Sequence, residues 1–156
     1  MILFSSGVII GISLFVAAFL VFFIVGSIIT NKNKKEVKNK VINIFNNYGE
    51  TLINNKDFLF KYKKRTYEVY FQNVNLKKEI SINNEKTWQI YGSPNILLNM
   101  DRLAENNKPK IVIIYPTEEK IKRYINENTV EFVGFQMSYT YYAILLKDLD
   151  EFLKSL

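Results

Sequence analysis

Positively charged side chains form the most distinct chemical pattern in this chain. Four of them, Lys61, Lys63, Lys64 and Arg65, fall within the five residues KYKKR. Five more follow an apolar N-terminal segment, at Lys32, Lys34, Lys35, Lys38 and Lys40. Such clusters attract the phosphates of nucleic acids or the headgroups of anionic lipids, and the two groups could form one basic surface. For KYKKR we favour the other interpretation, a solvated turn in a chain that is rich in Lys throughout.

The side chains that carry most enzyme chemistry are missing from the sequence. The 156 residues include no Cys and no His, which excludes disulfides, thiolate metal sites and a lipid-modified Cys, and removes the commonest general base. The acidic groups Glu118/Glu119 and Asp148/Asp150/Glu151 each fall at a predicted helix start, where the helix dipole favours negative charge without a metal. We therefore expect a protein that is not an enzyme and holds no cofactor or metal.

An uncharged N-terminal segment differs sharply from the rest of the chain. All 21 Lys and Arg and all 15 Asp and Glu residues follow Asn31. The stretch from Gly7 to Ile29 would span roughly 30–35 Å as a helix, which matches the hydrocarbon core of a bilayer. A signal peptide cleaved after Ser27 is the alternative, but it would need a positive start and a shorter apolar core. Gly7 and Gly11 have the spacing of a helix-pairing motif, although one such pair also arises by chance.

The lysines after this segment predict its orientation. Positive residues close to a membrane span stay on the cytoplasmic side, so the N-terminus should face outward and the following domain inward. An abundance of Lys, Asn and Ile is typical of an AT-rich bacterial genome, which makes the inner membrane the expected location. We divide the chain into an anchor (1–31), a basic segment with an amphipathic helix (32–56) and a cytoplasmic domain (57–156).

The soluble part has alternating helical and strand periodicities. A helix is predicted over about 36–54, and it would continue from the span after a short break at 30–34. Alternation of Phe58 and Phe60, and then of Tyr67 and Val69, predicts a hairpin with its turn at 63–65. Further strands are predicted at 79–83, 87–91, 111–115, 129–133 and 139–146, and the wholly apolar 111–115 is expected at the centre of a sheet. Ser93-Pro94, Thr117 and Asp148 are placed as helix starts. The predicted order is α-β-β-β-α-β-α-β-β-α, an α/β (α+β) domain with a small mixed sheet and helices packed against it.

Aromatic side chains are frequent in the last third of the chain and allow two interpretations. Interleaved with Lys, they could stack on nucleic-acid bases. Alternation along a strand instead predicts that they are core residues, and we favour this for Trp88, Phe132, Phe135, Tyr139, Tyr141 and Tyr142.

The stretch from Glu36 to Tyr115 resembles the restriction-endonuclease-like fold in its element order. Asp57-Phe58-Leu59-Phe60 looks like that family's first Asp and strand, and the residues from Lys63 to Tyr67 look like its basic turn and return strand. The family's Glu-x-Lys would then fall on Tyr70-Phe71-Gln72, which lacks both functional residues. Two carboxylates and a Lys serve Mg²⁺-dependent hydrolysis in that family, so the resemblance implies a degenerate member with Asp57 and Glu68 as vestigial ligands.

The sequence as a whole predicts a single-pass membrane protein whose domain is a non-catalytic interaction module. Residues 7–29 would contact the lipid bilayer, the juxtamembrane lysines would contact anionic headgroups, and the main partner would be another protein. The alternative is a membrane-tethered nucleic-acid-binding domain, either degenerate or an active Mg²⁺-dependent nuclease.

Overall fold

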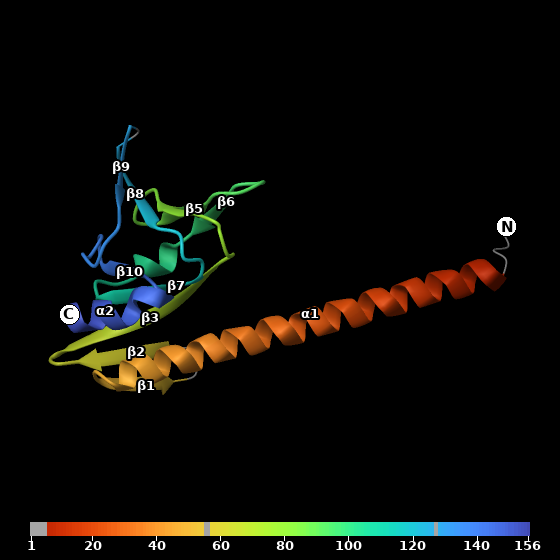
Figure 1. Cartoon of the computed structure of the whole chain (residues 1–156), viewed down its shortest axis with the longest axis horizontal. Helices are drawn as coiled ribbons and strands as arrows, with labels where there is room; N and C mark the ends of the chain where they lie inside the picture. Colours follow the sequence, from red (N-terminus) through yellow and green to blue (C-terminus); the bar gives the residue numbers. More distant parts are fainter. Residues whose placement is uncertain (1–5, 55–56, 127) are drawn as a thin grey trace. The chain divides into compact units, whose positions relative to one another are not determined.

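The computed structural model describes residues 6–54, 57–126 and 128–156, with side chains except at positions 6–13, 30 and 57. The chain divides between Val41 and Ile42 into two compact units, which we describe separately. The described part of the first is helical, and the second contains ten described strands and a C-terminal helix (Figure 1). The predicted α+β fold class is confirmed.

Helix α1 (Ser6–Asn46) contains the apolar segment that the sequence analysis identified. By length and composition it is the one described helix able to cross a membrane, and it lies near the N-terminus. The predicted break at 30–34 is wrong, because the helix continues through these residues without interruption. Thr, Asn and Lys fill this stretch, and none of them terminates a helix as Gly or Pro would.

The end of α1 corrects the predicted helix over 36–54. The helix stops at Asn46, and Glu50–Asn54 form strand β1 instead. The turn between them passes through Gly49, whose amide donates to the Phe45 carbonyl at 2.9 Å. A Cβ at Gly49 would lie 2.2 Å from the Lys61 carbonyl oxygen, so only glycine lets the chain turn this close to its neighbour.

The first sheet has the strand order β1-β2-β3-β7-β10. Strands β1, β2 (Asp57–Tyr62) and β3 (Arg65–Val74) form an antiparallel meander, which confirms the predicted hairpin. Strands β7 (Lys110–Pro116) and β10 (Tyr141–Leu145) extend it in parallel, with β7 between β3 and β10. Residues 110–115 are buried, so the central position predicted for 111–115 is confirmed.

The second sheet has the order β6-β5-β4-β8-β9. Its strands are β4 (Ile80–Ile82), β5 (Thr87–Ile90), β6 (Ile96–Asn99), β8 (Ile121–Asn126) and β9 (Thr129–Phe132). Strands β4 and β8 are parallel, and the other neighbours are antiparallel. The domain therefore contains two mixed sheets where the sequence predicted one.

The helix predicted from Ser93-Pro94 is wrong. Strand β6 pairs with β5 from Ile96 to Asn99, and only a short 3₁₀ turn (η1, Asp101–Leu103) follows. Ile96 and Leu97 have helical spacing to Met100 and Leu103, but they remain 45% and 68% exposed, whereas the other two are buried. Pairing with a neighbouring strand, which local spacing does not reveal, overrides the helical signal.

The helix predicted after Thr117 is also wrong, since β8 occupies this segment and pairs with β4. The Thr117 hydroxyl donates to the Lys78 carbonyl at 2.8 Å, and it accepts the Glu119 amide at 3.2 Å. These bonds hold a turn between β7 and β8, which places Glu118 and Glu119 in an exposed loop rather than at a helix dipole.

Both sheets contribute to one hydrophobic core. Apolar residues of β3, β4, β5, β7, β8 and β10 form a single buried cluster that includes Trp88, Val112 and Tyr141. On the opposite side of the first sheet, the ring of Phe45 stacks on Phe60 with centroids 4.2 Å apart. Helix α2 (Leu149–Ser155) follows a 3₁₀ turn (η2, Leu146–Asp148), which confirms the helix predicted after Asp148, and it buries Leu149, Phe152 and Leu153.

Candidate functional site

The basic stretch KYKKR forms the tip of the β2–β3 hairpin. Lys63 adopts a left-handed conformation (φ 53°) in the two-residue turn. Lys61 lies 3.6 Å from the Glu50 carboxylate, and the Lys63 ammonium lies 4.6 Å above the Tyr62 ring. Lys64 and Arg65 are exposed, and neither lies within 4.0 Å of a carboxylate in the described part of the chain. The tip therefore carries positive charge that the surrounding domain leaves uncompensated.

The five juxtamembrane lysines lie on α1, beyond its apolar stretch. Lys32, Lys34, Lys35 and Lys40 are exposed and Lys38 is half-buried, while Lys32 lies 4.0 Å from Glu36. At 3.6 residues per turn these positions point in several directions around the helix rather than along one face. Such a distribution suits a collar of charge at a membrane surface better than a docking stripe for one partner.

The expected vestigial ligands do not form a described metal site. The Asp57 side chain lies outside the described residues, so its distance from Glu68 is not defined. Among the described residues no group of three or more acidic or other metal-ligating side chains converges. Glu68 is largely buried and belongs to a different arrangement, which the sequence analysis did not anticipate.

Glu68 sits in a polar cluster with residues from the loop before β7. Its carboxylate accepts hydrogen bonds from Tyr70 at 3.1 Å and from Asn106 at 3.2 and 3.3 Å, and it lies 3.5 Å from the Lys108 ammonium. Burial and then the Glu68 charge raise the pKa of Tyr70 to about 12. Donors already surround both carboxylate oxygens, so this geometry suits a structural clamp better than a metal ligand.

Lys110 completes this cluster from the start of β7. Its buried ammonium donates to the Asn106 carbonyl at 2.7 Å, the Asn106 side chain at 3.0 Å and the Lys108 carbonyl at 2.9 Å. Burial lowers the pKa of this amine from its ordinary value. The parallel register of β3 and β7 places Glu68 beside Lys110. A lone Lys before five apolar residues was the sequence signal for this contact.

The aromatic residues divide between core and surface. Trp88 and Tyr141 are fully buried, and the indole nitrogen donates to the Tyr141 hydroxyl at 3.1 Å. Tyr139 and Phe132 remain 50% and 59% exposed. The prediction of a core role is therefore confirmed for Trp88 and Tyr141 and wrong for Tyr139 and Phe132.

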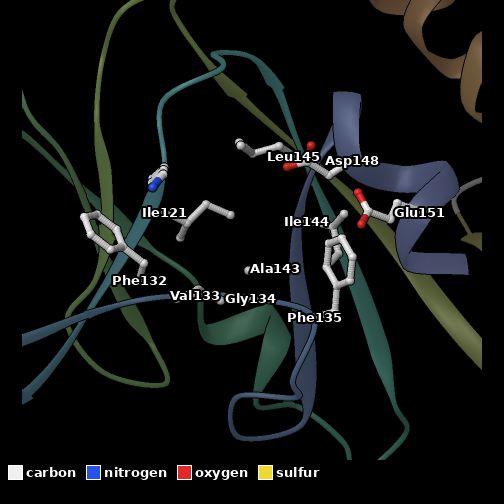
Figure 2. Close-up of a pocket in the computed structure, with 11 residues that line it drawn as sticks. Ile121, Phe132, Val133, Gly134, Phe135, Ala143, Ile144, Leu145, Asp148 and Glu151 are labelled. Carbon is white, nitrogen blue, oxygen red and sulfur yellow. The ribbon is translucent and has the colours of Figure 1, made fainter. Parts of the chain in front are cut away.

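A concave surface lies beside α2, and we call it the β10 groove (Figure 2). Its volume is about 350 Å³. Four buried apolar residues form its floor, and the aromatic side chains of Phe132 and Phe135 line its walls. Figure 2 shows Phe132 on one side of the groove and the carboxylates of Asp148 and Glu151 on the other. The residues of the groove come from three separate segments of the chain, so no local sequence pattern predicts it.

Comparison of the chain with protein-family models, curated proteins and solved structures finds no match. The resemblance to the restriction-endonuclease-like fold therefore stays a prediction. Functional inference rests on the geometry of α1, the hairpin tip and the β10 groove.

Proposed function

We propose that this protein is a single-pass membrane protein whose folded domain is a non-catalytic interaction module. The observation that carries the proposal is the apolar surface of α1. Every large hydrophobic side chain from Leu14 to Ile29 is exposed, between 48% and 80%. Soluble monomers rarely expose contiguous apolar surface of this extent, and a bilayer would cover it along its whole length.

The proposed orientation places the N-terminus outside and the domain in the cytoplasm, with the inner membrane of a bacterium as its location. The lysine collar from Lys32 to Lys40 supports this orientation, because positive residues next to a span are retained on the cytoplasmic side. In that position each exposed lysine would also attract anionic headgroups by about 1 kcal/mol.

The contacts of the Glu68 carboxylate support a non-catalytic role. Its oxygens face Tyr70, Asn106 and Lys108, which leaves this carboxylate engaged in holding the loop before β7. A Mg²⁺ ion would have to displace these donors before binding. We therefore propose that the domain functions by binding through its surface, with another protein as the main partner.

Nucleic-acid binding is the second candidate, and the hairpin tip favours it. Lys64 and Arg65 lack a described carboxylate partner, and they border a hollow of about 490 Å³ with Tyr62 and Tyr67. Basic side chains next to aromatic rings can hold a phosphate backbone and stack on a base. In this alternative the domain is a tethered nucleic-acid-binding protein, degenerate or active as a nuclease.

The membrane proposal is tested with the full chain in its native membrane. We expect protease added to intact spheroplasts to leave the domain whole, and protease added to inverted membrane vesicles to digest it. Digestion from the outside would refute the orientation. Release of the intact chain by alkaline carbonate would refute the anchor.

The choice between the two binding functions is tested with the full chain in nanodiscs of zwitterionic lipid. Labelled single- and double-stranded DNA and RNA are titrated over a salt series, with and without Mg²⁺. Binding that weakens steeply with salt and disappears on joint replacement of Lys61, Lys63, Lys64 and Arg65 by Ser would select the nucleic-acid function. Mg²⁺-dependent cleavage would revive the nuclease alternative. We expect neither result.

A further inference from the structure

The β10 groove lies along the edge of the first sheet and meets the second sheet at Ile121 and Phe132. Strand β10 is the last strand of the first sheet, and beyond the bridge between Ser138 and Tyr141 at its start it pairs only with β7 in the described domain. Ala143, Ile144 and Leu145 are consecutive, yet all three line the groove. Because successive residues of a strand point to opposite faces, a surface that touches all three runs along the strand edge. Backbone amides and carbonyls at such an edge can pair with an added strand.

The floor of the groove is apolar and closely packed. Ile121, Ala143, Ile144 and Leu145 are each at most 5% exposed. Phe132 projects from the end of β9 and remains 59% exposed, so one wall presents an aromatic surface to solvent. The floor is already shielded from water, so an occupant with apolar side chains would be stabilised mainly by covering the exposed ring of Phe132.

The α2 side of the groove carries negative charge that the domain leaves unpaired. Neither Asp148 nor Glu151 lies within 4.0 Å of a Lys or Arg nitrogen in the described residues. By contrast, Asp150 on the same helix is bound by Lys154 at 2.6 Å and by the Tyr48 hydroxyl at 2.7 Å. The one lysine lining the groove, Lys120, lies 4.9 Å above the Phe132 ring instead. A cation on the occupant would therefore complement the α2 side.

We propose that the β10 groove binds an extended segment of a partner protein in which apolar and basic side chains alternate. The segment adds beside β10 as a further strand, its apolar side chains cover the floor, and a Lys or Arg points to Asp148 and Glu151. Main-chain pairing supplies affinity in this mode and the side-chain positions supply specificity. This inference rests on the proposed function as an interaction module and names the class of partner.

The test uses the full chain in nanodiscs of zwitterionic lipid, so that basic peptides are not drawn to the bilayer. The probes are three labelled eight-residue peptides with alternating Leu and Arg, Leu and Glu, or Ser and Arg, measured by fluorescence anisotropy. We expect the Leu/Arg peptide to bind most tightly. Methylation of alternate backbone nitrogens should abolish its binding, because it removes the amides that pair with the strand edge.

A charge-neutral variant of the groove provides the decisive comparison. The double substitution Asp148→Asn with Glu151→Gln should weaken the Leu/Arg peptide by about threefold to thirtyfold, since two surface charges are lost. The matched control is Glu85→Gln with Glu105→Gln, which removes the same charge away from the groove and should leave affinity unchanged.

Several results would overturn the inference. They are equal binding of the Ser/Arg and Leu/Arg peptides, equal loss in the control variant, full binding of the methylated peptide, or displacement of the peptide by a second copy of this chain. Failure of the anchor would appear separately, as release of the chain by carbonate with peptide binding intact.

Discussion

Replacing Leu20 and Phe23 together by Arg should prevent α1 from spanning a membrane. Both side chains lie near the middle of the exposed apolar stretch, at 55% and 69% exposure. Twelve of the 16 residues from Leu14 to Ile29 are Leu, Ile, Phe or Val. At about −0.3 to −0.6 kcal/mol each, they favour insertion by roughly 4–7 kcal/mol.

The two arginines oppose this by a comparable amount. Each costs about 2.5–3.5 kcal/mol near the helix centre and also removes one favourable side chain, so the pair costs roughly 6–8 kcal/mol. Insertion should therefore be lost in the double variant and largely retained in either single variant. The assay is the fraction of full chain that stays in the membrane pellet after alkaline carbonate extraction.

Two control variants separate insertion from other effects. Leu20→Ala with Phe23→Ala shortens the same side chains without adding charge and should stay in the pellet. Leu52→Arg with Ile53→Arg places two arginines on exposed apolar positions of β1 and should stay there too. Retention of the Leu20/Phe23 arginine variant in the pellet would show that a bilayer does not hold this helix.

Three further predictions concern the folded domain. Tyr141→Phe leaves the Trp88 N–H without its acceptor and should lower the free energy of unfolding by about 1–3 kcal/mol, measured by urea titration of Trp88 fluorescence. Lys110→Met leaves three oxygens without their donor and should lower it by about 2–4 kcal/mol in the same titration. The absorbance titration of the wild-type chain minus that of Tyr70→Phe should show a phenol with a pKa of about 12, and a difference near pH 10 would refute the burial of Tyr70 beside Glu68. Because the folded pKa of Tyr70 is raised, its stabilising effect is complete below pH 10 and is lost as the pH rises through 12.

Local patterns predicted the elements whose partners lie nearby in sequence. The alternation of Phe58, Phe60, Tyr67 and Val69 identified the β2–β3 hairpin, whose strands meet through a two-residue turn. The uninterrupted apolar run of β7 identified a central strand. In each case burial of one face, or of both, leaves a periodicity that can be recognised without knowing the tertiary structure.

The two helices that were predicted wrongly show the limit of local sequence information. Ser93-Pro94 and Thr117 are suitable helix starts, and the residues after them have helical spacing. Each segment nevertheless pairs with a strand of the second sheet, β6 with β5 and β8 with β4. Hydrogen bonds and side-chain contacts across a sheet depend on the position of that neighbour, which local spacing does not contain.

The sequence by itself determined the apolar span, the lysines beside it, the lack of Cys and His, and the α+β class. These properties depend on composition and on contacts within a few residues. Only the tertiary structure decided the surfaces, because strand register joins distant positions. It set Glu68 beside Lys110 through β3–β7 pairing, and it brought Phe132, Ala143 and Glu151 around one groove. The physical reason is that a binding surface forms where chain segments meet, and their meeting is fixed by burial of a shared core.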